Sequence, residues 1–358
     1  MISPLLDEIL RAASVNGASD VIIHSGRPAV LRIDGELHPV ESEHPDERDM
    51  DALWAVCGAG ASDSDRDASL TTEDGVRFRV NLLRQLGSRG AVLRRIRKEI
   101  PDLESLGLPA EILREWTARK SGIIIVSGPT GSGKSTSLAA MLEWINTTMA
   151  RHIVTIEDPV EFLFESKQSL FTQREVGIDT PAFAEGLRRS LRQNPDIIFL
   201  GEIRDADSAL TAIQAAETGH IVLTTLHASS CGDVLDRLEL LFPPDERESV
   251  RKTLSTQLLG VLCQRLIPAA SGGRALLCEF FSNSALSRKL VAEGRMSELQ
   301  DFIARGDPRM ARSFANALLH LVREGSVTEA AALEISDNPQ EFSRSLRGIS
   351  SSTQATRR

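Results

Sequence analysis

Glycine, hydroxyl and lysine residues are grouped in one ten-residue stretch of this sequence, SGPTGSGKST. Three glycines allow the backbone to curl until successive N–H groups point inward at one anion. The lysine can reach the outer phosphates of a bound nucleotide, and the serine after it can bind Mg²⁺. The stretch therefore predicts a phosphate-binding loop for ATP, with ten nucleotide-binding residues: Ser127, Gly128, Pro129, Thr130, Gly131, Ser132, Gly133, Lys134, Ser135 and Thr136.

The elements on either side of this loop are those that a phosphate site requires. An apolar run, Ile123–Val126, precedes it and is typical of a buried strand. After it, apolar residues recur at helical spacing between Ser137 and Asn146. The start of that helix adds partial positive charge facing the anion. A glycine turn without function is the alternative, and the filled motif positions with these flanks argue against it.

Polar residues follow or flank three further apolar runs, His152–Ile156, Ile197–Leu200 and Ile221–Thr225. Strands that alternate with helices and are almost wholly apolar indicate a parallel sheet covered on both faces. Ligands of such sheets collect at the carboxyl ends of the strands. An isolated glutamate after a strand is more often a cap or an ion-pair partner. Three such ends beside a phosphate loop favour a catalytic site that includes Glu157, Asp158, Glu202 and His227.

Cleavage of a phosphate needs a metal, an oriented water molecule and positive charge. Glu202 is the candidate for polarising the water, since it ends the second of the three runs. Gly201 stands where many such ATPases have a metal-binding aspartate, so we expect Mg²⁺ to depend on Glu157 and Asp158 together with Ser135. His220 and His227 fit either a core position or γ-phosphate sensing, and their placement at both ends of one strand favours sensing.

The most basic segment of the chain lies between Val76 and Lys98. Val76–Asn81 and Ala91–Ile96 are expected to be strands, and alternation along a strand allows several arginines to share one face. These side chains either bind one anionic ligand or pair with acids of another subunit, and the residues alone leave both possibilities open. The basic residues are Arg77, Arg79, Arg84, Arg89, Arg94, Arg95, Arg97 and Lys98.

The length of 358 residues predicts two domains. Residues 1–100 are expected to form a small α/β domain, and 101–110, with two prolines and a glycine, a linker. Residues 111–345 are expected to form the nucleotide-binding domain; beyond Cys231 we expect mostly helices, with one short strand over Ala275–Phe280. The tail, 346–358, ends in a polar stretch and is expected to be disordered.

Composition excludes several other classes of protein. A formal net charge of −9, 4% aromatic residues and the absence of tyrosine argue against a nucleic-acid partner. No apolar run reaches membrane-spanning length, and the acidic N-terminus is unlike a signal peptide, so we expect a cytoplasmic protein. The four cysteines form no CxxC pair, which predicts buried thiols instead of a zinc site or disulfides: Cys57, Cys231, Cys263 and Cys278.

Together these motifs resemble the secretion ATPase superfamily, and most closely its type IV pilus retraction ATPases of the PilT and PilU kind. The likeness runs from about Ala18 to about Gly306 and rests on SGPTGSGKST, VTIEDPVEF, QREVGIDTPAFAEGLRRSLRQNPDII, GEIRDADSALTAIQAAETGHIVLTTLH and other segments such as RFRVN. The resemblance implies a PAS-like N-terminal domain, a RecA-like core and a homo-hexameric ring. It also implies a peripheral contact with a pilus platform protein of the inner membrane.

The resemblance further implies roles for individual residues. Acidic groups between Ile156 and Glu161 would lie near the metal, and Glu202 would be the catalytic glutamate. The histidine box would cover Gly219–His227. Arg79 and Arg94, matched through RFRVN and AVLRRI, would reach the nucleotide phosphates.

The chain departs from the retraction pattern in a few places. Gly87 stands where retraction ATPases often have an arginine, GEIRD replaces their usual GEMRD, and residues 285–291 match the retraction helix only loosely. The long N-terminal extension and the four-cysteine zinc insert of the pilus-assembly branch are both missing, so we expect a retraction motor. The alternatives are an assembly motor, an ATPase of a DotB-like type IV or a type II secretion system, and an ATP-gated ring without hydrolysis. Lys134 and Glu202 argue against the last.

Overall fold

The computed structural model describes residues 2–33, 35–41, 43–60, 62–96, 98–307 and 309–348. Arg97 and residues 349–358 of the expected tail therefore lie outside the described residues. The chain divides into two compact units. One comprises Met1–Glu99 with Pro159–Leu163, and the other Ile100–Asp158 with Phe164–Arg358. The polypeptide thus passes between the units before Ile100 and again on either side of Pro159–Leu163.

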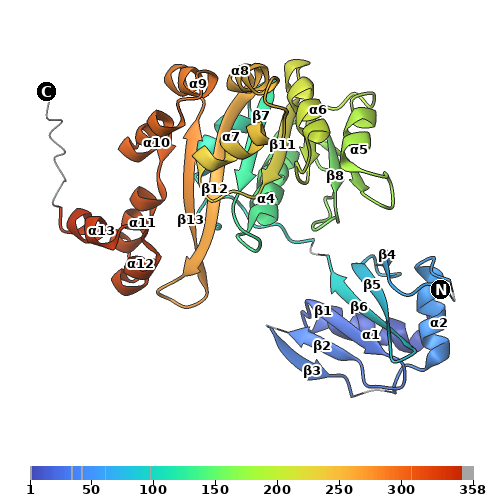
Figure 1. Ribbon diagram of the computed structural model, residues 1–358. Coiled ribbons are helices and arrows are strands. Elements are labelled where there is room, and N and C mark those ends of the chain that lie inside the picture. The colour runs from blue at the N-terminus through green and yellow to red at the C-terminus, as the bar shows by residue number, and fades with distance from the viewer. Residues whose placement is uncertain are drawn as a thin grey trace, which may run out of the picture. The chain divides into compact units, whose positions relative to one another are not determined.

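The first unit is a six-stranded sheet whose neighbouring strands are all antiparallel, in the order β3-β2-β1-β6-β5-β4. Alternate residues of β5, such as Phe78 and Val80, are buried in one cluster with apolar residues of two helices. The helices therefore cover one face of the sheet (Figure 1). The arginines between those residues lie on the other face, because side chains alternate along a strand. The bounds are α1 Pro4–Val15, β1 Asp20–His24, β2 Val30–Ile33, β3 Glu36–Pro39, α2 Glu47–Val56, β4 Arg66–Thr71, β5 Arg77–Gln85 and β6 Ser88–Arg95.

The second unit contains an eight-stranded sheet in the order β14-β13-β12-β7-β11-β10-β8-β9, counted over the residues described. The strands from β12 to β9 run parallel, whereas β13 and β14 are antiparallel at one edge. The bounds of its strands are β7 Gly122–Ser127, β8 His152–Glu157, β9 Leu170–Glu175, β10 Ile197–Leu200, β11 Ile221–Leu226, β12 Leu258–Pro268, β13 Arg274–Ser282 and β14 Ala311–Arg312.

Two hydrophobic cores lie on opposite faces of this sheet. Ile123 and Ile125 of β7 belong to one core, and Ile124 and Val126 to the other, which explains the unbroken apolar run. Helices α3 and α4 contribute to the second core and the remaining helices to the first. Figure 1 shows α11 to α13 beside β13, at one edge of the sheet. The bounds of the helices in this unit are α3 Ala110–Thr117, α4 Lys134–Thr148, α5 Phe183–Ser190, α6 Ala206–Glu217, α7 Cys231–Leu240, α8 Arg247–Gln257, α9 Ala285–Ala292, α10 Met296–Arg305, α11 Phe314–Arg323, α12 Glu329–Ile335 and α13 Pro339–Leu346.

The α/β class expected from the sequence is confirmed, but two local expectations are wrong. Residues 101–110, expected to be a linker, belong to the second unit, because Leu103 and Leu108 are buried in its core. The region beyond Cys231 is also less helical than expected. The long strand β12 lies between β7 and β13 in the middle of the sheet, with Val261, Leu262 and other residues fully buried.

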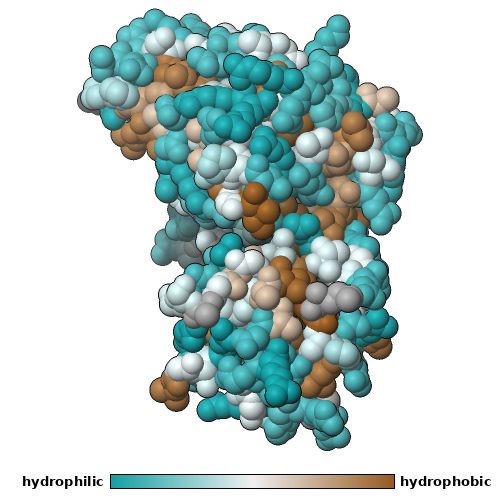
Figure 2. All heavy atoms as spheres, turned by 90° about the vertical axis from the view of Figure 1, so that its right-hand side faces the viewer, coloured by the Kyte–Doolittle hydropathy of each residue, from teal (hydrophilic) through white to brown (hydrophobic). Residues whose placement is uncertain are grey.

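None of the helices in the described part of the chain is long and apolar enough to cross a bilayer. Hydrophilic residues cover most of the face seen in Figure 2, with smaller hydrophobic areas between them.

Candidate active site

The phosphate loop connects the end of β7 to the start of α4. Gly128, Gly131 and Gly133 have φ values of +144°, +77° and +88°, in the region that favours glycine. A Cβ atom on Gly128 would lie 2.3 Å from the carbonyl oxygen of Gln264, a residue of β12. The loop therefore needs glycine at position 128 both for its dihedral angles and for space.

Donor groups of the loop suit an anionic ligand. The Oγ atom of Ser132 is buried and has no hydrogen-bond partner among the residues described. The Nζ atom of Lys134 donates to the carbonyl oxygens of Gly128 at 2.9 Å and Pro129 at 3.0 Å, so the ammonium group is folded over the loop. Lys134 is also the first residue of α4, where helical N–H groups have no partner within the helix. These groups fit the phosphates of ATP.

A serine anchors this loop to the segment that follows β11. The Oγ atom of Ser127 donates to the carbonyl oxygen of Leu226 at 2.9 Å and accepts from the backbone N–H of Ala228 at 2.9 Å. Strands β7 and β11 are adjacent, with Ser127 opposite Leu226. His227 therefore lies at the carboxyl edge of the sheet, beside the beginning of the phosphate loop.

Two predicted acids and this histidine come together at the same edge. Leu200 lies opposite Ile156 in β8 and Thr224 in β11, so the residues after these strands are neighbours. Nε2 of His227 lies 3.5 Å from Oε1 of Glu202. Arg204, to which the sequence assigned no role, donates through Nε to Oε2 of Glu202 at 2.8 Å and through NH1 to Oδ2 of Asp158 at 3.2 Å. The structure thus joins Asp158, Glu202 and His227 into one polar group.

Glu157, the other predicted acid, is buried at the end of β8. One of its oxygens, Oε1, accepts from Oγ1 of Thr155 at 2.6 Å and from Nε2 of Gln173 at 3.2 Å. Carboxylate and hydroxyl oxygens are the ligands that Mg²⁺ prefers. The oxygens of Glu157 and Asp158 at the strand end, together with the hydroxyl of Ser135 on the first turn of α4, are of the chemical kind that this ion takes.

The structure does not bring His220 to this group. His220 precedes β11, whose first residue is paired with Gly122 at the start of β7, and Gly122 N–H donates to the His220 carbonyl oxygen at 3.0 Å. The phosphate loop leaves the other end of β7, roughly 20 Å away for a six-residue strand. The His220 ring instead lies against the end of α6, with Nδ1 2.9 Å from the carbonyl oxygen of Ala215. The expectation that His220 senses the γ-phosphate is therefore wrong for a nucleotide bound to the phosphate loop of the same chain.

Arg79 and Arg94 of the first unit lie directly opposite each other on β5 and β6. Both are on the face of the sheet that the helices leave uncovered. Arg94 Nε donates to Oδ1 of Asp20 at 2.8 Å, and Arg79 NH2 lies 3.9 Å from Oδ1 of Asp67. Two guanidinium groups on one face are suited to binding one polyanion.

The other arginines of the basic segment do not all share this face. Arg84 and Arg89 both stack on the ring of Trp54 in α2, at 5.3 and 5.1 Å from its centre. Arg95 donates to the carbonyl oxygen of Ser14 in α1 at 3.0 Å. The expectation that several arginines could face one anion therefore applies to Arg77, Arg79 and Arg94, which share the uncovered face. Arg84, Arg89 and Arg95 lie on the side of the helices.

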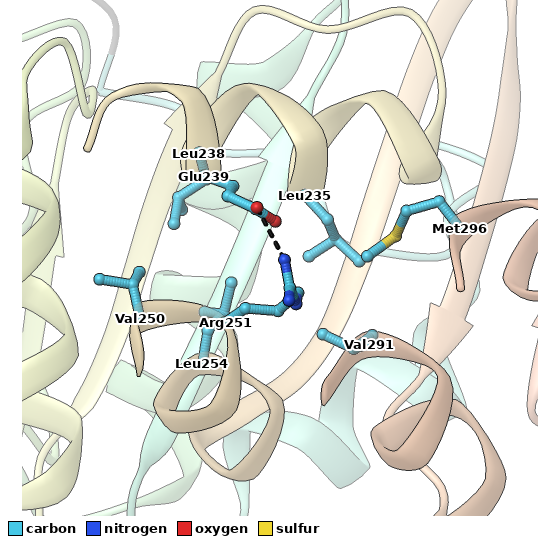
Figure 3. A pocket seen from close by; sticks show the side chains of 8 residues that line it. All are labelled: Leu235, Leu238, Glu239, Val250, Arg251, Leu254, Val291 and Met296. Carbon is cyan, nitrogen blue, oxygen red and sulfur yellow. Dashed lines mark hydrogen bonds and ion pairs between the residues drawn. The ribbon is translucent and has the colours of Figure 1, made fainter. Parts of the chain in front are cut away.

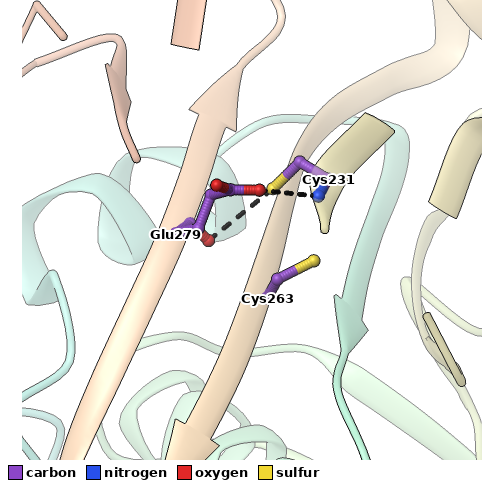
Figure 4. A group of neighbouring side chains, drawn as sticks. All are labelled: Cys231, Cys263 and Glu279. Carbon is purple, nitrogen blue, oxygen red and sulfur yellow. Dashed lines mark hydrogen bonds between the residues drawn. The ribbon is translucent and has the colours of Figure 1, made fainter. Parts of the chain in front are cut away.

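A second polar cluster lies inside the fold, between α7, β12 and β13 (Figure 4). Ligand atoms of Cys231, Cys263 and Glu279 lie within 4.8 Å of one another. However, the two oxygens of Glu279 accept the first N–H groups of α7 and α11, from Cys231 at 2.8 Å and Phe314 at 3.4 Å. Burial raises the pKa of the Cys231 thiol well above its ordinary value and also raises the pKa of Glu279. Glu279 therefore has a structural role in this cluster, because it accepts hydrogen bonds at the N-termini of two helices. All four cysteines are buried and unpaired, as expected.

A small hollow also lies among helices α7 to α10, away from the strand ends (Figure 3). An ion pair between Arg251 and Glu239, with NH1 and Oε1 2.7 Å apart, crosses it. No residue of the phosphate loop lines this hollow, so we do not assign it to the nucleotide site.

Comparison with known proteins agrees with this geometry. The family model described as "Type II/IV secretion system protein" matches residues 1–300. The "Type IV pilus retractation ATPase PilT" of Pseudomonas aeruginosa is 37% identical over 94% of this chain and 99% of its own length. A crystal structure of the pilus retraction motor PilT with bound ADP is 38% identical, covers 94% of this chain and 98% of its own, and superposes with a TM-score of 0.85.

The ATPase DotB of Legionella pneumophila is also similar in structure, with 27% identity, a TM-score of 0.82 and coverage of 94% of this chain and 96% of its own. The predicted fold, with a PAS-like N-terminal domain and a RecA-like core that carries C-terminal helices, is confirmed by the likeness to PilT. The chain belongs to the type II/IV secretion system protein family.

Proposed function

We propose that this chain is the motor that retracts a type IV pilus. As a member of its family the chain is an ATPase. The observation that supports pilus retraction in particular is the likeness to PilT, which spans 94% of this chain and 99% of that protein. A nucleotide site of the kind that a motor needs, with phosphate loop, acids and histidine at one sheet edge, supports it.

In the proposed reaction the loop from Ser127 to Thr136 binds the phosphates of ATP. Backbone N–H groups and the Ser132 hydroxyl donate to phosphate oxygens, and Lys134 turns from the loop carbonyls toward the outer phosphates. Bound Mg²⁺, held through Ser135 and the acids Glu157 and Asp158, would supply positive charge to the phosphates. The ten loop residues therefore orient the nucleotide at the carboxyl edge of the sheet.

Hydrolysis requires a base for the attacking water and charge for the transition state. Glu202 is the proposed base, and its carboxylate lies beside His227, which would sense the γ-phosphate. Arg79 and Arg94 are proposed to neutralise the transferring phosphoryl group, as arginine fingers do. Because these arginines belong to the other unit, turnover would depend on both units of the chain.

We further propose that six chains form a ring, which works in the cytoplasm against a platform protein at the inner membrane. Turnover would then move the two units of each subunit against one another. The three chain connections between the units, at Glu99–Ile100 and on either side of Pro159–Leu163, would take up this movement. Sequential hydrolysis around the ring would turn the membrane partner.

Deletion of the gene, followed by complementation, tests this assignment. A retraction motor predicts cells that keep abundant surface pili but lose twitching motility, because pili still assemble and cannot shorten. Cells without pili would instead identify an assembly motor. Normal pili with a loss of protein export would identify a secretion ATPase, which the likeness to DotB, at a TM-score of 0.82, makes the second candidate.

A further inference from the structure

Arg204 occupies a position between the two carboxylates at the carboxyl edge of the sheet. Its Nε atom donates to Glu202, and NH1 donates to Asp158. Its guanidinium carbon also lies 5.5 Å from the centre of the Phe183 ring, at the first residue of α5. Groups from three separate elements therefore orient the planar guanidinium fork.

The backbone on both sides of Glu202 is held by neighbouring strands. Gly201 N–H donates to the carbonyl oxygen of Ile156 at 2.8 Å, and Ile203 N–H donates to that of Thr225 at 3.1 Å. In addition, Oγ1 of Thr225 donates to the Gly201 carbonyl oxygen at 2.6 Å. The Cα position of Glu202 is therefore fixed by the sheet, whereas the direction of its carboxylate depends on the side chains that contact it.

Among the residues described, two side chains make a polar contact with that carboxylate. Arg204 bonds Oε2 at 2.8 Å, and His227 lies 3.5 Å from Oε1. The closer contact is thus the arginine, whose guanidinium group is a permanently charged donor. Because the Arg204 side chain is 54% exposed, solvent screens much of its charge. The geometry of its hydrogen bond therefore contributes more than its charge to the orientation of the Glu202 carboxylate.

We propose that Arg204 is a positioning residue, which holds the Glu202 carboxylate in the orientation that activates water. With Oε2 bonded to Arg204, the carboxylate cannot rotate freely, and Oε1 is presented to the reacting water. This inference rests on the proposed role of Glu202 as the base. Asp158 and Phe183 in turn contact the guanidinium group and help to orient it.

The test compares steady-state ATP turnover of the full-length wild-type chain with Arg204→Gln and Arg204→Lys. Misdirection of a catalytic group lowers kcat by about 10- to 100-fold, with KM for ATP within about twofold of the wild-type value. Arg204→Lys keeps the charge without the planar fork and should give an intermediate kcat. Arg188→Gln is the matched control, because Arg188 also pairs with an exposed acid, Asp207, at 3.2 Å in the same unit. It should leave kcat unchanged.

A double mutant separates positioning from a general structural effect. In a Glu202→Gln background, where the base is already lost, adding Arg204→Gln should change kcat by less than about twofold. A wild-type kcat for Arg204→Gln, a loss carried by KM, or an undiminished loss in the double mutant would each overturn the proposal. Normal turnover of Glu202→Gln alone would instead refute the proposed base, whatever the arginine variants do.

Discussion

Replacing Gly128 with alanine should damage the phosphate loop more than the same change at Gly131. Both glycines have positive φ, +144° and +77°, where an alanine has a backbone cost of about 1–3 kcal/mol. Only at Gly128 does the added Cβ meet other atoms, the Gln264 carbonyl oxygen at 2.3 Å and Ser132 Oγ at 2.7 Å. Nothing lies within 4 Å of a Cβ at Gly131.

The obstacle at Gly128 cannot move aside easily. Gln264 lies in β12, paired with Cys278 of β13, and its Nε2 donates to Oγ of Ser137 in α4 at 2.7 Å. The loop must therefore shift instead, which adds about 1–3 kcal/mol in overpacking. If this overpacking cost of about 1–3 kcal/mol must be met in the ATP-bound loop, ATP affinity is roughly 5- to 150-fold weaker for Gly128→Ala than for Gly131→Ala.

The assay is titration of each purified variant with a fluorescent ATP analogue, together with thermal unfolding. Unfolding temperatures show whether each variant is folded, and the ratio of the two dissociation constants gives the effect of the clash. Equal affinities for the two variants, or a weaker affinity for Gly131→Ala, would refute the contact between loop and β12 on which the calculation rests.

Three further predictions concern residues elsewhere in the chain. Lys134→Ala should abolish tight ATP binding while the unfolding temperature stays that of the wild type. The control is Lys252→Ala, which changes an exposed lysine. Wild-type ATP affinity in Lys134→Ala would contradict the assignment of the phosphate loop. Arg79→Ala and Arg94→Ala should each lower phosphate release by about 10³-fold or more, and full activity of either would remove that arginine from the site. Burial raises the pKa of Glu279 above its ordinary value of 4.5, so the folded chain binds more protons than the unfolded chain. The free energy of unfolding therefore falls as the pH rises from 4.5 through the raised pKa. Urea unfolding of Glu279→Gln should lack that part of the pH dependence, whereas an unchanged slope would contradict it.

Structural features that depend on residues close together in the sequence were predictable. The loop between Ser127 and Thr136 depends on glycines, a lysine and flanking apolar residues that are contiguous in the chain. The carboxyl ends of parallel strands meet at one edge, so Glu202 and His227 could be expected to lie together, and the structure places them 3.5 Å apart. His220 failed this reasoning because it lies at the amino end of the same strand.

Features that depend on distant contacts were not predictable. Residues 101–110 contain turn-forming residues, yet Leu103 and Leu108 find partners in a core made by later elements. Strand β12, Leu258–Pro268, is apolar at almost every position, so its pattern does not distinguish a buried strand from a buried helix. Arg204 was missed because its partner Asp158 is 46 residues away, and only folding brings them together.

The most direct test of Glu202 as the catalytic base is ATP turnover by Glu202→Gln, with ATP binding measured on the same sample. The amide keeps the shape of the side chain but cannot accept the proton from water. A catalytic base at position 202 predicts ATP binding at wild-type affinity and phosphate release slower by about 10²- to 10⁴-fold. Turnover close to the wild-type rate in a variant that binds ATP normally would contradict it, and would show that another group at this edge of the sheet activates the water.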